Sequence, residues 1–189
     1  MRAVRDGDVA KLGVLFERHH RPVFEFLVRM TGDRTAAEDL VQDVFVRMLK
    51  YRATYRDVGS FETWMFRIAR NARADYFQDR RATTLVSDAG VDVPSAAPAA
   101  PTVLERAEEV DQLRRALLLI RDDRRELIVL ARYRGMKYEQ IAELLEVDVG
   151  TIKVRMHRAM KELRDTFLRL TSGNQPCDVM TSPSILPTI

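Results

Sequence analysis

Residues 138–164 read YEQIAELLEVDVGTIKVRMHRAMKELR, two helix patterns separated by a short turn. Apolar residues recur at three- and four-residue spacing up to Leu145, and the pattern resumes after Asp148, a candidate N-cap, and runs to about Leu170. The small residue Ala142 permits the close crossing that the two helices of a helix-turn-helix make. This stretch therefore predicts a helix-turn-helix.

The second helix of this motif carries polar side chains on the face opposite its apolar stripe. They are Thr151, Lys153, Arg155, His157, Arg158 and Lys161. In a helix-turn-helix the second helix inserts its first turns into the major groove, where such donors meet phosphates and guanine edges. A solvated helix face explains the same cations equally well. The acidic residues Glu139, Glu143 and Glu146 on the first helix favour DNA binding, because they leave the positive potential concentrated on the second helix.

Two further helix patterns precede this motif, over residues 104–119 and 122–133. Their apolar positions are core candidates, namely Leu113, Leu117, Ile120, Leu127, Ile128 and Leu130. Gly135 then breaks the chain before the helix-turn-helix. We therefore expect residues 104–170 to form one small helical domain.

Neither flank of this domain shows a helix period. Residues 83–103 contain three prolines and a run of alanines, and we expect an extended linker whose 21 residues reach at most ~65 Å as polyproline II at about 3.1 Å per residue. Residues 171–189 are rich in Pro, Ser and Thr, and we expect a disordered tail. The single cysteine, Cys177, falls in this tail, so one chain can build neither a disulfide nor a thiolate zinc site.

Residues 1–82 predict a second helical bundle. A helix is expected to begin at Pro22, which suits a first turn, and to end at Gly32. A capping-box pattern at Thr35 opens the next amphipathic helix, and Ser60 is the candidate N-cap of the last one. The predicted fold class is therefore all-α, with two small helical domains joined by a flexible linker.

The last helix of that bundle interleaves arginines with aromatic residues. The two sets are Arg67, Arg70, Arg73, Arg80 and Arg81, and Phe61, Trp64, Tyr76 and Phe77. Bases stack on rings while guanidinium groups hold the backbone, so this pattern suits single-stranded DNA. Core packing explains Phe61 and Trp64 better, because both fall on the apolar stripe. The net charge is only +3, so the placement of the cations, rather than their number, indicates nucleic-acid binding.

The chain lacks the motifs of the common nucleotide-binding enzymes and of membrane proteins. It has neither a Gly-Lys-Ser/Thr phosphate loop nor a Gly-x-Gly-x-x-Gly fingerprint. His19, His20 and His157 lack neighbours at metal-ligand spacing, and we expect His19 and His20 to form a pair at a helix end. No stretch reaches the ~18 apolar residues of a membrane span, and the N-terminus is charged. We therefore expect a cytoplasmic, non-enzymatic protein without a cofactor or metal.

Three blocks of sequence, in this order, carry a resemblance to a known family. They are AEDLVQDVF at 37–45, FETWMFRIARN at 61–71, and YEQIA at 138–142 followed by VGTIK at 149–153. On these blocks the chain resembles an extracytoplasmic-function (ECF, group 4) sigma factor of the bacterial sigma-70 family. The resemblance implies that residues 1–82 are sigma region 2 and residues 104–170 are sigma region 4. It also implies an alternative RNA polymerase sigma factor, which directs promoter-specific initiation by reading −10 and −35 elements and is controlled by an anti-sigma factor.

The resemblance places polymerase binding on one helix of region 2. Asp39, Gln42, Asp43 and Arg47 would dock on the clamp helices of the β′ subunit, and region 4 would contact the β flap. The spacing agrees independently, because these positions share the helix face opposite the apolar stripe. An ordinary solvated face would show the same spacing.

The resemblance also distributes the promoter contacts. For the −10 element it implies a connector that captures a flipped base, with arginines holding the backbone; these residues are Tyr55, Arg56, Ser60, Phe61, Arg67, Arg70, Asn71 and Arg73. For the −35 duplex it implies Lys137, Thr151, Lys153, Arg155, His157 and Arg158. A stand-alone helix-turn-helix regulator stays open as the alternative, because the same module occurs in many regulators. A ligand pocket or dimer surface in residues 1–82 would favour that alternative.

Overall fold

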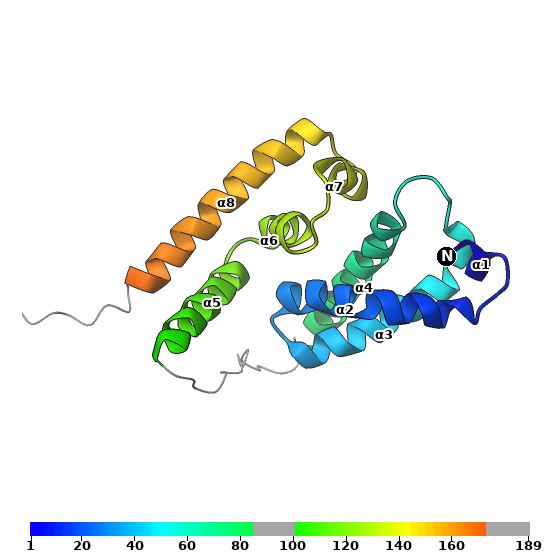
Figure 1. The fold of residues 1–189 in the computed structure, drawn as a ribbon, viewed down its shortest axis with the longest axis horizontal. Coiled ribbons are helices and arrows are strands. Elements are labelled where there is room, and N and C mark those ends of the chain that lie inside the picture. The colour runs from blue at the N-terminus through cyan, green and yellow to red at the C-terminus, as the bar shows by residue number, and fades with distance from the viewer. Residues whose placement is uncertain (85–100, 173–189) are drawn as a thin grey trace, which may run out of the picture.

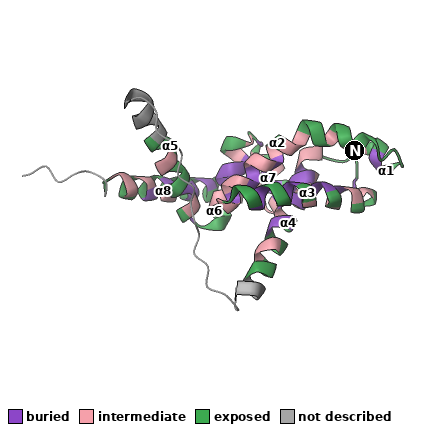
Figure 2. Cartoon of the chain, turned by 90° about the horizontal axis from the view of Figure 1, so that it is seen from below, coloured by how far each residue is buried: buried purple, intermediate pink, exposed green. Residues whose placement is uncertain are grey.

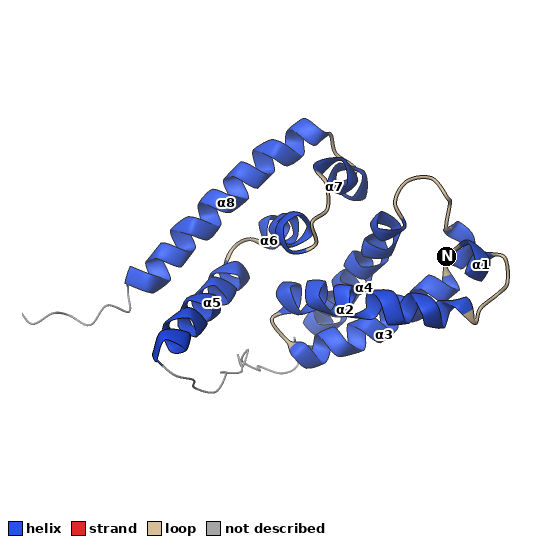
Figure 3. Cartoon of the chain, in the orientation of Figure 1, coloured by secondary structure: helices blue, strands red, loops and turns tan. Residues whose placement is uncertain are grey.

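The computed structural model describes residues 1–84 and 101–172, with side chains for residues 1–80 and 108–172. Every regular element in these ranges is helical, and none is a strand, so the predicted all-α class is confirmed (Figures 1 and 3). The elements are α1 (Arg2–Arg5), α2 (Lys11–Thr31), α3 (Arg34–Lys50), η1 (Arg52–Thr54), α4 (Phe61–Thr84), α5 (Pro101–Leu119), α6 (Asp122–Ile128), the π-helical turn η2 (Val129–Tyr133), α7 (Tyr138–Leu145) and α8 (Val149–Ser172). None of these helices is both long enough and apolar enough to cross a membrane.

The N-terminal unit is built from α2, α3 and α4, which pack against one another around a common core. Phe26 of α2 meets Phe66 of α4 edge to face, with ring centroids 5.2 Å apart, and both side chains are buried. Met48 of α3 and Met65 of α4 are also fully buried. Burial of these large apolar side chains supplies most of the driving force for this unit.

The N-terminal helices differ from the predicted ones at two boundaries. The helix expected to begin at Pro22 is the second half of the continuous helix α2, with Pro22 in its interior. Proline there removes one backbone donor, but Leu12 and Leu15 before it are partly buried against the same core as the residues after it, and this packing outweighs the local loss. The N-cap of α3 is Asp33 rather than Thr35, because the Ala36 N–H donates to Asp33 Oδ1 at 3.0 Å. Gly32 ends α2 as expected, in the left-handed conformation with φ of 74°.

The C-terminal unit contains the predicted helix-turn-helix, formed by α7 and α8. Ile141 and Ala142 of α7 and Ile152 and Met156 of α8 are buried in the shared core. Asp148 is the N-cap of α8 as predicted, since the Thr151 N–H donates to its Oδ1 at 2.8 Å. These details confirm the predicted boundary between the two helices.

Upstream of the motif, the helix expected over 122–133 changes its winding halfway. After α6 the chain continues as η2, in which the Arg134 N–H donates to the Val129 carbonyl five residues back at 3.0 Å. Of the six core candidates in this region, Leu113 is wrong, because it is 36% exposed, whereas the other five are buried. The region predicted as a linker lies largely outside the described residues, but the prediction is wrong at its two ends, because α4 runs to Thr84 and α5 begins at Pro101. Cys177 and nearly all of the predicted tail also lie outside the described residues, although α8 runs on to Ser172.

The two helical units are in contact with each other. Helix α4 packs against α7, and α2 packs against α5 and η2, so one apolar cluster runs through both units. Figure 2 shows the buried residues gathered around α2, α3 and α7. Amphipathic patterns predict which faces are apolar, but they do not predict that two units with separate cores will also contact each other.

Candidate nucleic-acid and polymerase interfaces

The polar face of α3 is exposed, as the sequence predicts. Asp39 and Gln42 are exposed on the side of α3 away from its buried stripe. Arg47 donates from Nε to Asp43 Oδ2 at 2.8 Å and also pairs with Asp75 of α4. The hydrogen bond to Asp75, together with the charge of Asp43, raises the pKa of Arg47. Arg47 is therefore held in place by two carboxylates, whereas the side chains of Asp39 and Gln42 are exposed to solvent.

The connector before α4 has an exposed tip above a buried aromatic cluster. Arg56 and its neighbours up to Gly59 are exposed. Tyr55, by contrast, is only 7% exposed, and its ring lies 5.3 Å from Trp64 and 6.1 Å from Phe61. Ser60 accepts a hydrogen bond from the Glu62 N–H at 3.2 Å, as its predicted capping role requires. In this conformation Tyr55 supports the loop from beneath, and Arg56 is its accessible polar residue.

The histidines of α2 are not the helix-end pair that the sequence suggested. Both lie within α2, where His20 stacks on Phe16 at 4.9 Å and His19 meets Phe61 edge-on at 5.0 Å. Burial lowers the pKa of His19. His19 therefore extends the aromatic cluster beneath the connector, and sequence reasoning missed it because the contact joins residues 42 positions apart.

Three of the predicted −10 arginines point from α4 toward the C-terminal unit. Arg70 Nε donates to Glu126 Oε1 at 2.7 Å, and Arg73 donates to both carboxylate oxygens of Asp122 at 2.6 and 2.5 Å. Arg67 donates to the Glu143 carbonyl at 3.2 Å. Asn71, in contrast, is exposed on α4. The structure therefore brings the three arginines together on one face of α4, where Arg73 is buried, Arg70 is half-buried and Arg67 stays 41% exposed.

The partners of these arginines on α6, Asp122 and Glu126, were not among the predicted site residues. The Asp122 side chain is 56% exposed, and its partial burial on its own would raise its pKa, but the hydrogen bonds and charge of Arg73 hold that pKa below its ordinary value. Glu126 is buried, with only 7% of its surface exposed. A buried carboxylate needs a cation, and that requirement is the physical signal that links α6 to α4. In the sequence, Asp122 in the first turn of its helix looks like an ordinary dipole partner, and no local pattern links Glu126 to α4.

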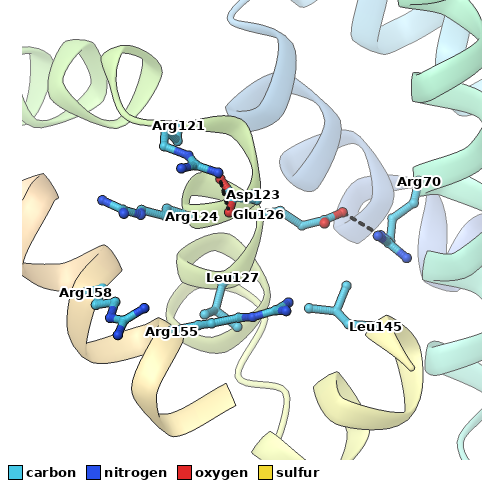
Figure 4. A pocket seen from close by; sticks show the side chains of 9 residues that line it. All are labelled: Arg70, Arg121, Asp123, Arg124, Glu126, Leu127, Leu145, Arg155 and Arg158. Carbon is cyan, nitrogen blue, oxygen red and sulfur yellow. Dashed lines mark hydrogen bonds and ion pairs between the residues drawn. The ribbon is translucent and has the colours of Figure 1, made fainter. Parts of the chain in front are cut away.

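A cavity of about 360 Å³ opens beside the Arg70–Glu126 pair. Figure 4 shows that its walls come from α4, α6, α7 and α8. Five arginines line it, against two acids; they are Arg70, Arg121, Arg124, Arg155 and Arg158. The cavity thus connects the covered face of α4 with the cations of α8.

The cations of α8 remain exposed. Lys153, Arg155, His157 and Arg158 are all exposed, and so is Lys137 just before α7. Thr151 differs, because its hydroxyl and its N–H both donate to Asp148 and so complete the helix cap. The hydrogen bond from the hydroxyl, and to a smaller extent the one from the N–H, lowers the pKa of Asp148. The exposed face of α8 has the position and charge that contact with a major groove requires.

Comparison with known families assigns both units. The family description "Sigma-70 region 2" matches residues 15–83, and "Sigma-70, region 4" matches residues 111–163. The RNA polymerase sigma factor CarQ of Myxococcus xanthus is 32% identical over 87% of this chain and 94% of its own length. The ECF RNA polymerase sigma factor SigL of Mycobacterium tuberculosis is 30% identical over 86% of this chain and 92% of its own.

Two solved structures share the fold. One is the sigma factor RpoE in complex with the anti-sigma factor NepR from Bartonella quintana, with a TM-score of 0.67 and 23% identity over 84% of this chain and 96% of that one. The other is CnrH in complex with the cytosolic domain of CnrY, with a TM-score of 0.64 and 24% identity over 92% of this chain and 96% of that one. At these identities the likeness establishes the arrangement of helices.

Proposed function

The chain belongs to the ECF sigma factors of the sigma-70 family, and from this premise we propose how its surfaces divide the work of promoter recognition. A sigma factor is a non-enzymatic initiation factor for RNA polymerase, so what has to be assigned is binding surfaces. The membership decides against the stand-alone regulator considered above. We assign region 2 to residues 1–82, region 4 to residues 104–170, and the connection between them to residues 83–103. We also propose that the protein works in the cytoplasm, because a sigma factor acts together with RNA polymerase.

The α3 face is proposed to dock on the clamp helices of the polymerase β′ subunit. Exposed Asp39 and Gln42, with the fixed Asp43–Arg47 pair beside them, form a polar stripe that a partner helix can read. Region 4 is proposed to reach the β flap, which would set the two DNA-binding units at a distance from each other on the enzyme.

The −10 element is proposed to bind at the connector and along α4. Arg56 lies at the exposed tip of the connector, and Ser60 and Phe61 lie where the connector meets α4. Beneath the tip, the ring of Tyr55 packs edge to face against Trp64, and this contact supports the loop. Arg67, Arg70 and Arg73 would hold the backbone of the opened strand, and Asn71 would support the captured base.

The −35 duplex is proposed to bind the exposed face of α8, through Lys153, Arg155, His157 and Arg158. Lys137 and Thr151 flank this face at the first turns of α7 and α8. The observation that carries the whole assignment is that the two sets of cations belong to helices of different units, α4 in the N-terminal unit and α8 in the C-terminal unit. One chain can then hold an open strand and a closed duplex simultaneously.

Run-off transcription tests the assignment. Purified core polymerase would be presented with a genomic promoter library, with and without the protein. We expect transcripts from a defined set of promoters only when the protein is added. An unchanged transcript pattern would contradict the proposal.

We also propose that an anti-sigma factor controls the protein, since the sigma factor RpoE is bound to one in its solved structure. A protein in this role must form a complex with the chain and abolish the run-off transcripts. A binding protein that leaves those transcripts unchanged would not be this regulator.

A further inference from the structure

Region 4 covers two of the −10 arginines of region 2 in this structure, and it contacts the third, Arg67, whose side chain stays 41% exposed. Arg73 keeps only 11% of its side chain exposed, and Arg70 keeps 30%. Their partners come from α6, and Arg67 meets the last turn of α7 and Glu146 beyond it. The same guanidinium groups are the ones assigned to the backbone of the −10 strand. A guanidinium group that binds a carboxylate cannot bind a phosphate through the same N–H donors at the same time.

The α6 carboxylates bind in the way a phosphate would. Arg73 donates two parallel hydrogen bonds to Asp122, which is the fork geometry that guanidinium groups also adopt with phosphate. Arg70 donates one hydrogen bond from Nε to Glu126 Oε1. The two acids, one helical turn apart on α6, therefore occupy two arginines that are one turn apart on α4.

An apolar contact continues this interface at its other edge. A Cβ placed on Gly32 would come within 3.0 Å of Leu118 Cδ1, so α2 and α5 are closely packed. Beside it, Arg125 donates to the Met30 carbonyl at 2.7 Å and so links α6 to the end of α2. The covering of α4 is thus one edge of an extended contact between the two units, rather than an isolated pair of side chains.

The contact has features of one that can open. Arg67 Nε and Arg73 Nε are buried without a hydrogen-bond partner in the described part of the chain, and a buried donor without an acceptor is unfavourable. The cavity next to Arg70 and Glu126 gives solvent and anions a route to this pair. The cations of α8 are not covered, since Lys153, Arg155 and Arg158 are all exposed.

We propose that this protein has an autoinhibitory closed form in which Asp122 and Glu126 of region 4 occupy the −10 arginines of region 2. In the closed form, the arginines that would bind the opened −10 strand are occupied, whereas the −35 surface on α8 stays accessible. Docking of the two regions at separate places on the polymerase then exposes the arginines. This proposal rests on the −10 assignment of Arg67, Arg70 and Arg73 made above.

A charge-matched pair of variants tests the closed form on the full chain. Asp122→Asn with Glu126→Gln removes the two carboxylates that cross the interface. Asp123→Asn with Asp165→Asn removes the same charge, but Asp123 pairs with Arg121 and Asp165 with Arg164 within region 4. The probe is fluorescent oligodeoxythymidine, which reports backbone capture without a promoter sequence. Energy transfer between dyes at Val14→Cys and Leu168→Cys, in a Cys177→Ser background, reports opening.

We expect the first variant to show lower energy transfer and several-fold tighter binding of the oligonucleotide, because a larger fraction of the chain is competent to bind. The control should match the unmodified chain in both measurements. Equal binding by the two variants would overturn the proposal, even if transfer falls. Run-off transcription with core polymerase remains the separate test of the −10 assignment, so either idea can fail alone.

A second variant opens the contact without changing α6, so the proposal stays testable even if the substitutions at Asp122 and Glu126 disturb that helix. Leu118→Glu introduces a charge where Leu118 packs on Gly32, at a contact that none of the three arginines makes. Leu119→Glu is its control, because Leu119 is 65% exposed. Opening by Leu118→Glu should tighten oligonucleotide binding despite the added negative charge. If Leu118→Glu lowers energy transfer without tightening binding, the closed form does not control access to the arginines.

Discussion

A single arginine on α8 can contribute to promoter affinity or to promoter selectivity, depending on which part of DNA it touches. Arg155 and Arg158 are exposed and have no ion-pair partner among the described residues. A guanidinium bound to two guanine acceptors discriminates between bases, whereas one bound to phosphate does not. The exposed position of both residues is compatible with either contact.

Arg155→Ala or Arg158→Ala is expected to cost about 1 to 3 kcal/mol at a specific −35 site if the residue binds guanine through both donors. Fluorescence anisotropy with −35 duplexes altered one base pair at a time would measure the loss. Arg164→Ala is the control, because Arg164 lies further along α8 and pairs with Asp165. Equal losses on every duplex would indicate phosphate contact only.

Phe66 is one of the large buried residues of region 2 at which a substitution should have a large effect on stability. Its ring is 1% exposed and meets Phe26 edge to face. Phe66→Ala should lower the free energy of unfolding by about 3 to 5 kcal/mol, because the lost burial leaves a cavity. Val58→Ala, at an 83% exposed position, is the control and should change it by less than about 0.5 kcal/mol. Urea denaturation followed by circular dichroism measures both, and similar midpoints would contradict the core assignment.

At the scale of elements, the sequence predicts helices well and their ends less well. The helix-turn-helix and the N-caps Ser60 and Asp148 follow from local pattern alone, because the residues that decide them lie within a few positions. Thr35 was wrong as a cap because Asp33 offers a competing acceptor two residues earlier. Pro22 was wrong as a helix start because tertiary packing carries α2 across it.

The α3 cap gives a direct comparison between the predicted and the observed residue. Asp33→Ala should destabilise the protein by about 0.5 to 2 kcal/mol, since the Ala36 N–H loses its acceptor. Thr35→Ala, at the predicted cap, should change stability by less than about 0.5 kcal/mol. Thermal unfolding of both variants measures the difference. A larger effect at Thr35 than at Asp33 would show that Thr35 is the N-cap, as the capping-box pattern predicts.

The outward face of α3 is predicted to bind the polymerase. Asp39→Ala with Gln42→Ala should weaken binding to core polymerase without changing the helical signal in circular dichroism, because both side chains are exposed. Glu109→Ala with Gln112→Ala makes the same exchange three residues apart on α5, and it should leave binding unchanged. Surface plasmon resonance with immobilised core enzyme measures both affinities. An unaltered affinity for the first variant would reject the docking assignment.

At the scale of the whole molecule, the contact between the two regions lay beyond sequence reasoning. The residues that meet are far apart in the chain, as Arg73 and Asp122 are by 49 positions, and amphipathic spacing reports only the faces of single helices. The functional surfaces could be listed residue by residue from the family resemblance. The covering of the −10 arginines could not, because it depends on Asp122 and Glu126 of region 4, and the local pattern of Asp122 is that of an ordinary acid in the first turn of a helix.

Acid should open the closed form, and the sign follows from Asp122. Its pKa lies below the ordinary value, because the hydrogen bonds and charge of Arg73, with Arg125 and Arg70 nearby, outweigh the effect of burial. A carboxyl whose pKa is lowered by a contact favours that contact when it is ionised. Its contribution is therefore complete above the ordinary aspartate pKa of about 3.9 and is lost as the pH falls through the lowered pKa.

Energy transfer between the region 2 and region 4 dyes, followed from neutral pH to about 3, should fall in the acid range set by that pKa. Circular dichroism at each pH separates opening from unfolding, since opening leaves the helices intact. In Asp122→Asn the side chain no longer titrates, so the curve should start at lower transfer and lose this acid step. Glu126 and the Glu25–Arg134 pair are unchanged in that variant, so the difference between the two curves isolates Asp122. Superimposable curves would mean that the Arg73–Asp122 pair does not hold the regions together.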